Sequence, residues 1–296
     1  MKKVVGIGAS VLDTLIECNV YPKEDIKYRA NNAFRTGGGP VANALVVLAK
    51  LGIDAHYLGN LSKNSEGDFL ASELNRYGVK TDGVYQVENT SAFTSYILLS
   101  KETGSRTCVF ERGNVPDEPK NLDFSIIDDA DVLHLDGNNL KTAIEASKYS
   151  KEKGVLVSLD AGGLYENIET LLPYVDILIP SEEFAMGITK TDNTTDAILK
   201  LQEKYNPKVL VVTEGSKGGI YYENGEVKRY SSLKVNCVDS NGAGDTFHGA
   251  FVASYLKGYD IENSCKIASI VAGLKCTKVG MRDAIPTFDE ALKLLK

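Results

Sequence analysis

One loop of this chain combines a glycine-rich turn, a predicted helix start and a carboxylate, all within Asp239-Ser240-Asn241-Gly242-Ala243-Gly244-Asp245-Thr246. Gly242 and Gly244 leave no side chain between the backbone N–H groups and an approaching anion. The apolar residues from Phe247 to Tyr255 recur at helical spacing, so the loop is predicted to open a helix whose positive end faces the same point. These features together are typical of phosphoryl transfer.

The carboxylate of Asp245 falls in the first turn of that predicted helix. There it can accept a proton from a hydroxyl while the N–H groups of Gly242, Ala243 and Gly244 hold a phosphate. The alternative is an acidic residue that only complements the helix dipole, which is the usual interpretation of a bare Gly-x-Gly-Asp. A second motif, upstream in the chain, favours the chemical interpretation.

The second motif is Thr36-Gly37-Gly38-Gly39-Pro40-Val41-Ala42-Asn43, followed by an almost wholly apolar stretch up to Gly52. Pro40 suits the first position of a helix and Gly52 its end, so a buried helix is predicted between them. Asn43 interrupts the apolar run and needs hydrogen-bonding partners there. A polyhydroxyl ligand would supply them, and a bond within its own loop would satisfy the amide equally well.

Together the two segments resemble the paired motifs of the ribokinase-like, or PfkB-type, carbohydrate kinases. The family's Gly-Gly-x-x-Ala-Asn matches Gly38 to Asn43, and its Asp-[Thr/Ser]-x-Gly-Ala-Gly-Asp matches Asp239 to Asp245. The resemblance also extends to the first strand and the C-terminal segment, so it covers nearly the whole chain. It implies transfer of the γ-phosphoryl group of ATP to a sugar hydroxyl, with Asp245 as the base and Mg²⁺ on the triphosphate.

The resemblance also implies a sugar site around Asp13, Gly38, Gly39 and Asn43. Asp13 comes just past the first predicted strand, where open parallel sheets bind their ligands, although a loop aspartate bonded to its own turn is the alternative. Arg106, in a predicted hairpin, can reach a substrate group, whereas most surface arginines have no such role. Ribose, fructose, a sugar acid or a nucleoside all present hydroxyls that this site could bind, and a sugar is favoured.

The nucleotide side is expected at a strand that ends in a glycine-rich turn, Thr213 to Gly219. The family's Thr-x-Gly-x-x-Gly matches three of these residues, and the resemblance adds one residue from the phosphate loop and one from the C-terminal segment. The predicted ATP-binding residues are Thr213, Gly215, Gly218, Asn241 and Gly280.

Two cation sites are also implied. Relatives usually show Asn-x-x-Glu where this chain has Ser181 to Phe184, so Glu182 or Glu183 is predicted to replace the missing acid near magnesium. The alternative is a solvated first helical turn capped by Ser181. Some relatives bind a monovalent cation, K⁺, through backbone carbonyls near Asp239 and Gly280, and the sequence leaves that site open here.

Strand-like runs alternate with amphipathic stretches along most of the chain, which predicts an α/β, doubly wound, mostly parallel sheet covered on both faces. Two irregular segments, approximately 14–36 and 86–114, are predicted insertions, the second a hairpin around Glu102-Thr103-Gly104-Ser105. In the family such insertions form a small β-sheet lid, often used for dimerisation. We therefore expect a single domain, 1–296, that forms a homodimer through its lid.

The composition excludes some classes of binding partner. The 296 residues carry a net charge of −7, which argues against nucleic acid and anionic membranes as partners. Five cysteines without a Cys-x-x-Cys pair suit reduced thiols, and no signal peptide or membrane span is recognisable, so a cytoplasmic protein is expected.

Three other functions are compatible with parts of this sequence pattern. A nucleoside kinase of the same family and a non-catalytic nucleotide- or sugar-binding protein would keep the same motifs. A Rossmann dehydrogenase is suggested by Gly6-x-Gly8, but Val11 occupies the position of the third glycine.

Overall fold

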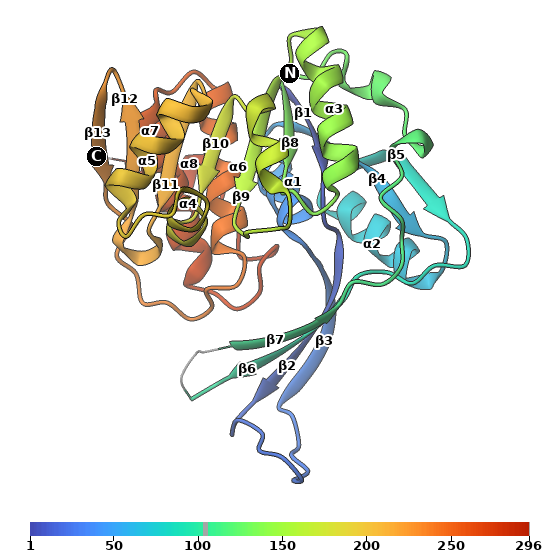
Figure 1. Ribbon diagram of the computed structural model, residues 1–296. Coiled ribbons are helices and arrows are strands. Elements are labelled where there is room, and N and C mark those ends of the chain that lie inside the picture. The colour runs from blue at the N-terminus through green and yellow to red at the C-terminus, as the bar shows by residue number, and fades with distance from the viewer. Residues whose placement is uncertain (103–105, 296) are drawn as a thin grey trace.

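The computed structural model describes residues 1–102 and 106–295, so Thr103, Gly104 and Ser105 of the predicted hairpin turn lie outside the described residues. The chain forms a large sheet with helices on both faces and a smaller sheet, the lid, that projects from it (Figure 1). The strands are β1 Lys3–Ile7, β2 Val11–Cys18, β3 Asn32–Gly38, β4 Asp54–Ser62, β5 Lys80–Val87, β6 Thr94–Ser100, β7 Arg106–Glu111, β8 Val132–Leu135, β9 Leu156–Ala161, β10 Ile177–Pro180, β11 Val209–Thr213, β12 Gly219–Glu223 and β13 Glu226–Tyr230. The α-helices are α1 Pro40–Lys50, α2 Ser65–Arg76, α3 Leu140–Lys153, α4 Glu182–Thr189, α5 Thr194–Tyr205, α6 Ala243–Leu256, α7 Ile261–Cys276 and α8 Phe288–Leu292.

The large sheet has the order β13-β12-β11-β10-β9-β8-β1-β4-β5. Its strands pair in parallel except for β12 and β13, which form an antiparallel edge. Successive residues of a strand face opposite sides, so Val4 packs with one group of helices and Val5 with the other. The first group includes α1, α2, α6 and α7, and the second includes α3, α4 and α5. The predicted doubly wound fold is confirmed.

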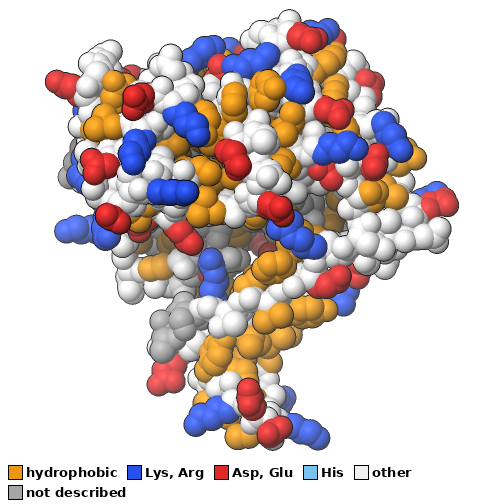
Figure 2. Space-filling view, in the orientation of Figure 1, with side chains coloured by type: hydrophobic (Ala, Val, Ile, Leu, Met, Phe, Trp, Pro, Cys, Tyr) orange, Lys and Arg blue, Asp and Glu red, His pale blue; other side chains and the backbone are white. Residues whose placement is uncertain are grey.

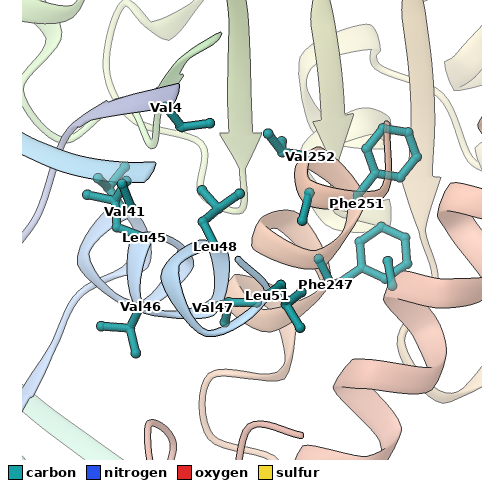
Figure 3. Close-up of a cluster of buried hydrophobic side chains, with 14 of the residues drawn as sticks. Val4, Val41, Leu45, Val46, Val47, Leu48, Leu51, Phe247, Phe251 and Val252 are labelled. Atoms are coloured by element: carbon teal, nitrogen blue, oxygen red, sulfur yellow. The ribbon is translucent and has the colours of Figure 1, made fainter. Parts of the chain in front are cut away.

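The two helices that carry the motifs, α1 and α6, pack directly against each other. Figure 3 shows Leu48 of α1 and Leu51, just after it, on the side of that helix toward α6, which carries Phe247 and Phe251 in the same cluster of buried side chains.

A glycine allows this close approach. A Cβ atom on Gly249 of α6 would lie 2.6 Å from the carbonyl oxygen of Ala44 and 2.8 Å from Cβ of Val47, closer than real Cβ contacts. The backbones of α1 and α6 are therefore nearly in contact, which fixes the position of one N-terminus relative to the other.

The lid is a four-stranded sheet with the order β3-β2-β6-β7, projecting at the bottom of Figure 1. β2 follows β1 after three residues, so the lid begins at the carboxyl edge of the large sheet. Asp13 pairs with Thr36 on one side and with Ser95 on the other. The residues of β7 are exposed throughout. No helix in the described part of the chain is both long and apolar enough to cross a membrane.

Candidate active site

The N-terminus of α6 forms an open cluster of backbone amides. Gly242 adopts a φ of +70° immediately before the helix, and a Cβ there would lie 2.3 Å from Cγ of Met281. First-turn N–H groups have no preceding helical turn to accept them, and here the N–H of Ala243 donates to the carbonyl oxygen of Ser240 at 3.2 Å. A Cβ on Gly244 would meet no atom within 4 Å, so the backbone here borders open space. This end of the helix suits an anion.

Asp245 lies in that first turn and is held by the other motif. Its Oδ2 accepts a hydrogen bond from Nδ2 of Asn43 at 2.7 Å, which joins the N-termini of α1 and α6. Burial raises the pKa of Asp245 above its usual value, the negative charge of Asp160 adds to the rise, and the bond from Asn43 opposes it. A carboxylate with a raised pKa is a stronger base, as proton abstraction from a hydroxyl requires.

A buried arginine completes this network. Nε of Arg282 donates to Oδ1 of Asn43 at 3.1 Å, so the amide of Asn43 bridges a cation and the carboxylate of Asp245. The side chain of Arg282 is 2% exposed, and burial lowers its pKa to about 10, although Glu73 and Asp13 favour the charged form. Sequence reasoning missed Arg282; the only available signal was its position two residues after Gly280.

Asp13 lies where the lid joins the large sheet, and its carboxylate accepts a hydrogen bond from a neighbouring strand of the lid. Oγ of Ser95 donates to Oδ1 of Asp13 at 2.6 Å. A Cβ on Gly38 would lie 1.9 Å from Oδ2 of Asp13, so only glycine leaves room for this carboxylate. Burial raises the pKa of Asp13 to about 6, with Ser95 and Arg282 opposing the rise.

Gly39, the other glycine of the predicted sugar site, allows a backbone conformation that other residues rarely adopt. Gly39 adopts a φ of +96°, and a Cβ there would lie 2.3 Å from the carbonyl oxygen of Ala9. Arg106 is exposed at the start of β7, and its positive charge acts to lower the pKa of Asp13.

A second buried pair lies beneath Asp245. Nε2 of His248, one turn along α6, lies 3.1 Å from Oδ1 of Asp160 on β9. Burial acts to raise the pKa of Asp160, but the neighbouring His248 holds it below its usual value. His248 is 4% exposed and is paired with the carboxylate that influences Asp245.

A cavity of about 450 Å³ borders the amide cluster on the side away from the lid root. Three of the predicted nucleotide-binding residues, Thr213, Gly215 and Gly218, line it together with Gly244. The other two, Asn241 and Gly280, line instead a small cavity of about 40 Å³, which also includes Asp13, Asn43 and Arg282. The predicted residues thus lie on two sides of one helix N-terminus.

The predicted cation ligands are placed separately. Glu182 and Glu183 occupy the first turn of α4, and Oγ of Ser181 accepts the N–H of Phe184 at 3.1 Å as the helix cap. Glu182 is half-buried and Glu183 is exposed. Among the described residues no group of three or more His, Cys, Asp or Glu side chains is arranged to hold a metal ion. The carboxylate of Asp239 accepts the N–H groups of Asn241 and Gly280 at 2.8 and 2.9 Å.

The comparisons with known proteins agree with this geometry. The model of the pfkB family carbohydrate kinases matches residues 1–288. The chain is 28% identical to a ribokinase of Arabidopsis thaliana, over 99% of this chain and 81% of that protein. It is 29% identical to the probable fructokinase-5 of the same plant, over 88% of each chain. The structure of Arabidopsis thaliana ribokinase complexed with ribose and ATP has a TM-score of 0.86 to this chain at 28% identity, covering 100% and 99% of the two chains. The chain therefore belongs to the PfkB family of carbohydrate kinases and is a sugar kinase, a phosphotransferase with a ribokinase-like fold.

Proposed function

We propose that this kinase transfers the γ-phosphoryl group of ATP to a hydroxyl of a sugar of the ribose, fructose or sugar-acid type. One arrangement carries the proposal: Asp245 follows Gly244, which lines the 450 Å³ cavity, and accepts a hydrogen bond from Asn43, which lines the small cavity with Asp13. Gly244 and Ala243, at the N-terminus of α6, line the cavity, and the hydrogen bond from Asn43 places the proposed base beside the small polar cavity. A nucleotide on one side and a sugar on the other would meet at that carboxylate.

In the proposed reaction, Asp245 accepts the proton of the sugar hydroxyl as its oxygen bonds to the γ-phosphorus. The bond from that phosphorus to the β–γ bridging oxygen breaks in line, and ADP leaves with the electron pair. The N–H groups of Gly242, Ala243 and Gly244 stabilise the negative charge on the equatorial oxygens. Asp13 accepts hydrogen bonds from other sugar hydroxyls and so orients the ring.

Magnesium fits the carboxylates available at this edge of the sheet. Proteins commonly hold Mg²⁺ through one or two carboxylates plus phosphate oxygens and water, so a cluster of three acids is not required. Glu182, at the start of α4, follows β10 at its carboxyl end, and we propose that it or Glu183 holds the metal through water. Bound there, the ion would neutralise charge on the β- and γ-phosphates.

The identity of the sugar is tested by measuring ADP release with a panel of sugars, sugar phosphates and nucleosides. The ribokinase and fructokinase relatives are equally distant, so neither substrate is favoured by identity. Turnover with an unphosphorylated sugar supports the proposal. Turnover with nucleosides alone would assign the nucleoside-kinase alternative, and no ADP release with any acceptor would contradict the proposal.

Gly244→Ala is expected to separate stability from turnover. The position is helical and open, so a methyl group there should stabilise the free protein by about 0.5–1 kcal/mol. The same methyl group would occupy space next to the proposed γ-phosphate, and we expect kcat to fall about a hundredfold. Thermal unfolding and steady-state kinetics measure the two effects. If Gly244→Ala has a normal kcat, the γ-phosphate does not approach this amide.

We propose that the chain forms a homodimer through the outer face of the lid. Tyr96 and Val109 lie opposite each other in register and are 52% and 61% exposed, and Ile16 and Leu98 continue this apolar face. Figure 2 shows hydrophobic side chains gathered along the lid. Such a face is typical of an interface between proteins.

Tyr96→Glu is therefore expected to convert a dimer into a monomer, measured by light scattering on size exclusion. The matched control is Tyr85→Glu, which changes a tyrosine of 46% exposure on β5, outside the lid, and should leave the mass unchanged. A wild-type protein that is monomeric at micromolar concentration would contradict the proposed interface.

A further inference from the structure

Lys275 is a buried lysine that the proposed reaction does not use. It lies in the last turn of α7, and its side chain is fully buried, with an exposed fraction of 0%. Lysine is rarely buried unless its ammonium finds oxygen partners, because removing a charge from water is costly. The partners of this ammonium therefore indicate its role.

Those partners are backbone carbonyls of the phosphate loop. Nζ of Lys275 donates to the carbonyl oxygen of Asp239 at 2.9 Å and also to the carbonyl oxygen of Asn241. It lies 3.9 Å from Oδ2 of Asp239. Burial lowers the pKa of Lys275, and the negative charge of Asp239 opposes this fall. Two carbonyls and a carboxylate thus surround one positive group.

The same oxygens are those that a monovalent cation would need. The sequence resemblance implied a K⁺ site formed by backbone carbonyls near Asp239 and Gly280, and carbonyl oxygens are typical K⁺ ligands. Here the carbonyls of Asp239 and Asn241 accept from Lys275, and the carboxylate of Asp239 accepts from Asn241 and Gly280. These residues do not fit an added ion, because its ligands are already bound to donors of the chain.

We propose that the ammonium group of Lys275 acts as a built-in cation that positions the phosphate loop, so that this kinase needs no added potassium. Ammonium and potassium ions have similar radii and both bind oxygen, which makes the substitution chemically reasonable. The catalytic part of this inference rests on the proposed function.

The effect on the reaction would be indirect, and Lys275 is a positioning residue. The carbonyl of Asn241 lies in the same planar peptide unit as the N–H of Gly242, and the carbonyl of Asp239 lies in the same unit as the N–H of Ser240, so fixing each carbonyl fixes the direction of that N–H. The loop is also anchored by the N–H groups of Val238 and Asp239, which donate to the carbonyl of Cys276. Holding the carbonyls toward α7 therefore aims the amides of α6 at the cavity.

The first experiment uses the wild-type protein. Turnover and thermal midpoint are compared in potassium chloride and in choline chloride at equal ionic strength. We expect both quantities to agree between the two salts. An activation by potassium of about tenfold or more, or a midpoint raised only by potassium, would overturn the proposal.

The second experiment compares two variants of the same position. Lys275→Ala removes the ammonium and leaves a space lined by carbonyls, and we expect kcat to fall about tenfold or more in choline and to recover in potassium. Lys275→Met removes the charge but fills the space with an apolar chain, so potassium should not restore it. Sodium and lithium serve as size controls. Equal responses of the two variants to potassium, or full activity of both in choline, would overturn the proposal.

The thermal measurement keeps this inference separate from the proposed function. The midpoint of Lys275→Ala should rise in potassium relative to choline, and that of Lys275→Met should not. This readout requires no substrate. If the protein phosphorylated no acceptor in the panel, the proposed function would fail, while the salt dependence of the midpoint would still test the built-in cation.

Discussion

Replacing Asp245 by asparagine is expected to lower kcat by about two to four orders of magnitude. The amide has nearly the same shape as the carboxylate, and its oxygen can still accept the hydrogen bond from Asn43. It cannot accept a proton from a hydroxyl. Steady-state ADP release with the best sugar of the panel measures the loss, and we expect KM to change much less than kcat, because the group acts mainly in the transition state.

Removal of this half-buried negative charge should not unfold the protein. Burial raises the pKa of Asp245, so its ionised form is disfavoured in the folded state, and a neutral amide relieves that cost. The control is Asp68→Asn, which changes an exposed aspartate on α2 that accepts a hydrogen bond from Nε2 of Gln86 and should leave kcat near normal. Near-normal turnover of a folded Asp245→Asn protein would exclude this residue as the base.

Arg282→Met is expected to have the largest effect on stability. Methionine keeps the length of the side chain but removes the cation that donates to Asn43 and faces Asp13 and Glu73. Removing one partner from a buried charged network costs about 3–5 kcal/mol, because the remaining charges lose their compensation. Chemical denaturation measures this loss. The control, Arg76→Met, removes an exposed arginine next to Glu73 and should cost less than about 0.5 kcal/mol.

The same variant should change how sugar binding depends on pH. The pKa of Asp13 is raised to about 6, and Arg282 acts to lower it, so loss of the arginine should raise it further. Only the ionised carboxylate accepts hydroxyl hydrogens at both oxygens. In the wild type we expect the KM for sugar to rise as the pH falls through about 6. In Arg282→Met the rise should begin at a higher pH, and an unchanged profile would contradict a role for Asp13 in binding.

The stability of the free protein should respond in the opposite direction. The folded protein binds a proton at Asp13 more readily than the unfolded chain does, since the folded pKa lies above 3.8. The contribution of Asp13 to stability is therefore complete below about pH 4 and is lost as the pH rises through about 6. Acidification within that window weakens binding while it favours folding at this residue.

The fold was predictable because its signals are local. Runs such as Val4 to Ile7 and Val155 to Leu159 are short, apolar and bounded by polar or glycine residues, and these two form most of strands β1 and β9 of the large sheet. The exact helix starts were harder to place. Ser65, with Asp68 three residues later, has the spacing of a capping box in the sequence, yet the cap of α2 is Asn64, whose side chain accepts from the N–H groups of Glu66 and Gly67. Neighbouring polar residues can each serve as the N-cap, and the conformation of the backbone before the helix determines which of them does.

The missed residues share a different property. Arg282 and Lys275 acquire their roles from partners that are distant in the sequence. Arg282 bonds to Asn43, 239 positions away, and Lys275 bonds to Asp239, 36 positions away. Nothing in the local pattern says whether a basic residue near a helix end points to solvent or is buried. The roles of the glycine motifs, in contrast, can be recognised from the local sequence, because only glycine permits the backbone conformations and close approaches at these positions.

The close contact of α1 and α6 at Gly249 divides the molecule into a rigid part and an adaptable part. Asp245, the proposed proton acceptor, and its partner Asn43 lie on two helix backbones that cannot slide past each other. The lid strands, proposed to face the sugar, extend outward from Asp13, where β2 pairs with β3 and β6. Lineages could therefore exchange lid sequences and acquire new acceptors without realigning the reacting atoms. Grafting the lid of a kinase with another preference onto this scaffold would be a direct route to altered specificity with the chemical step preserved.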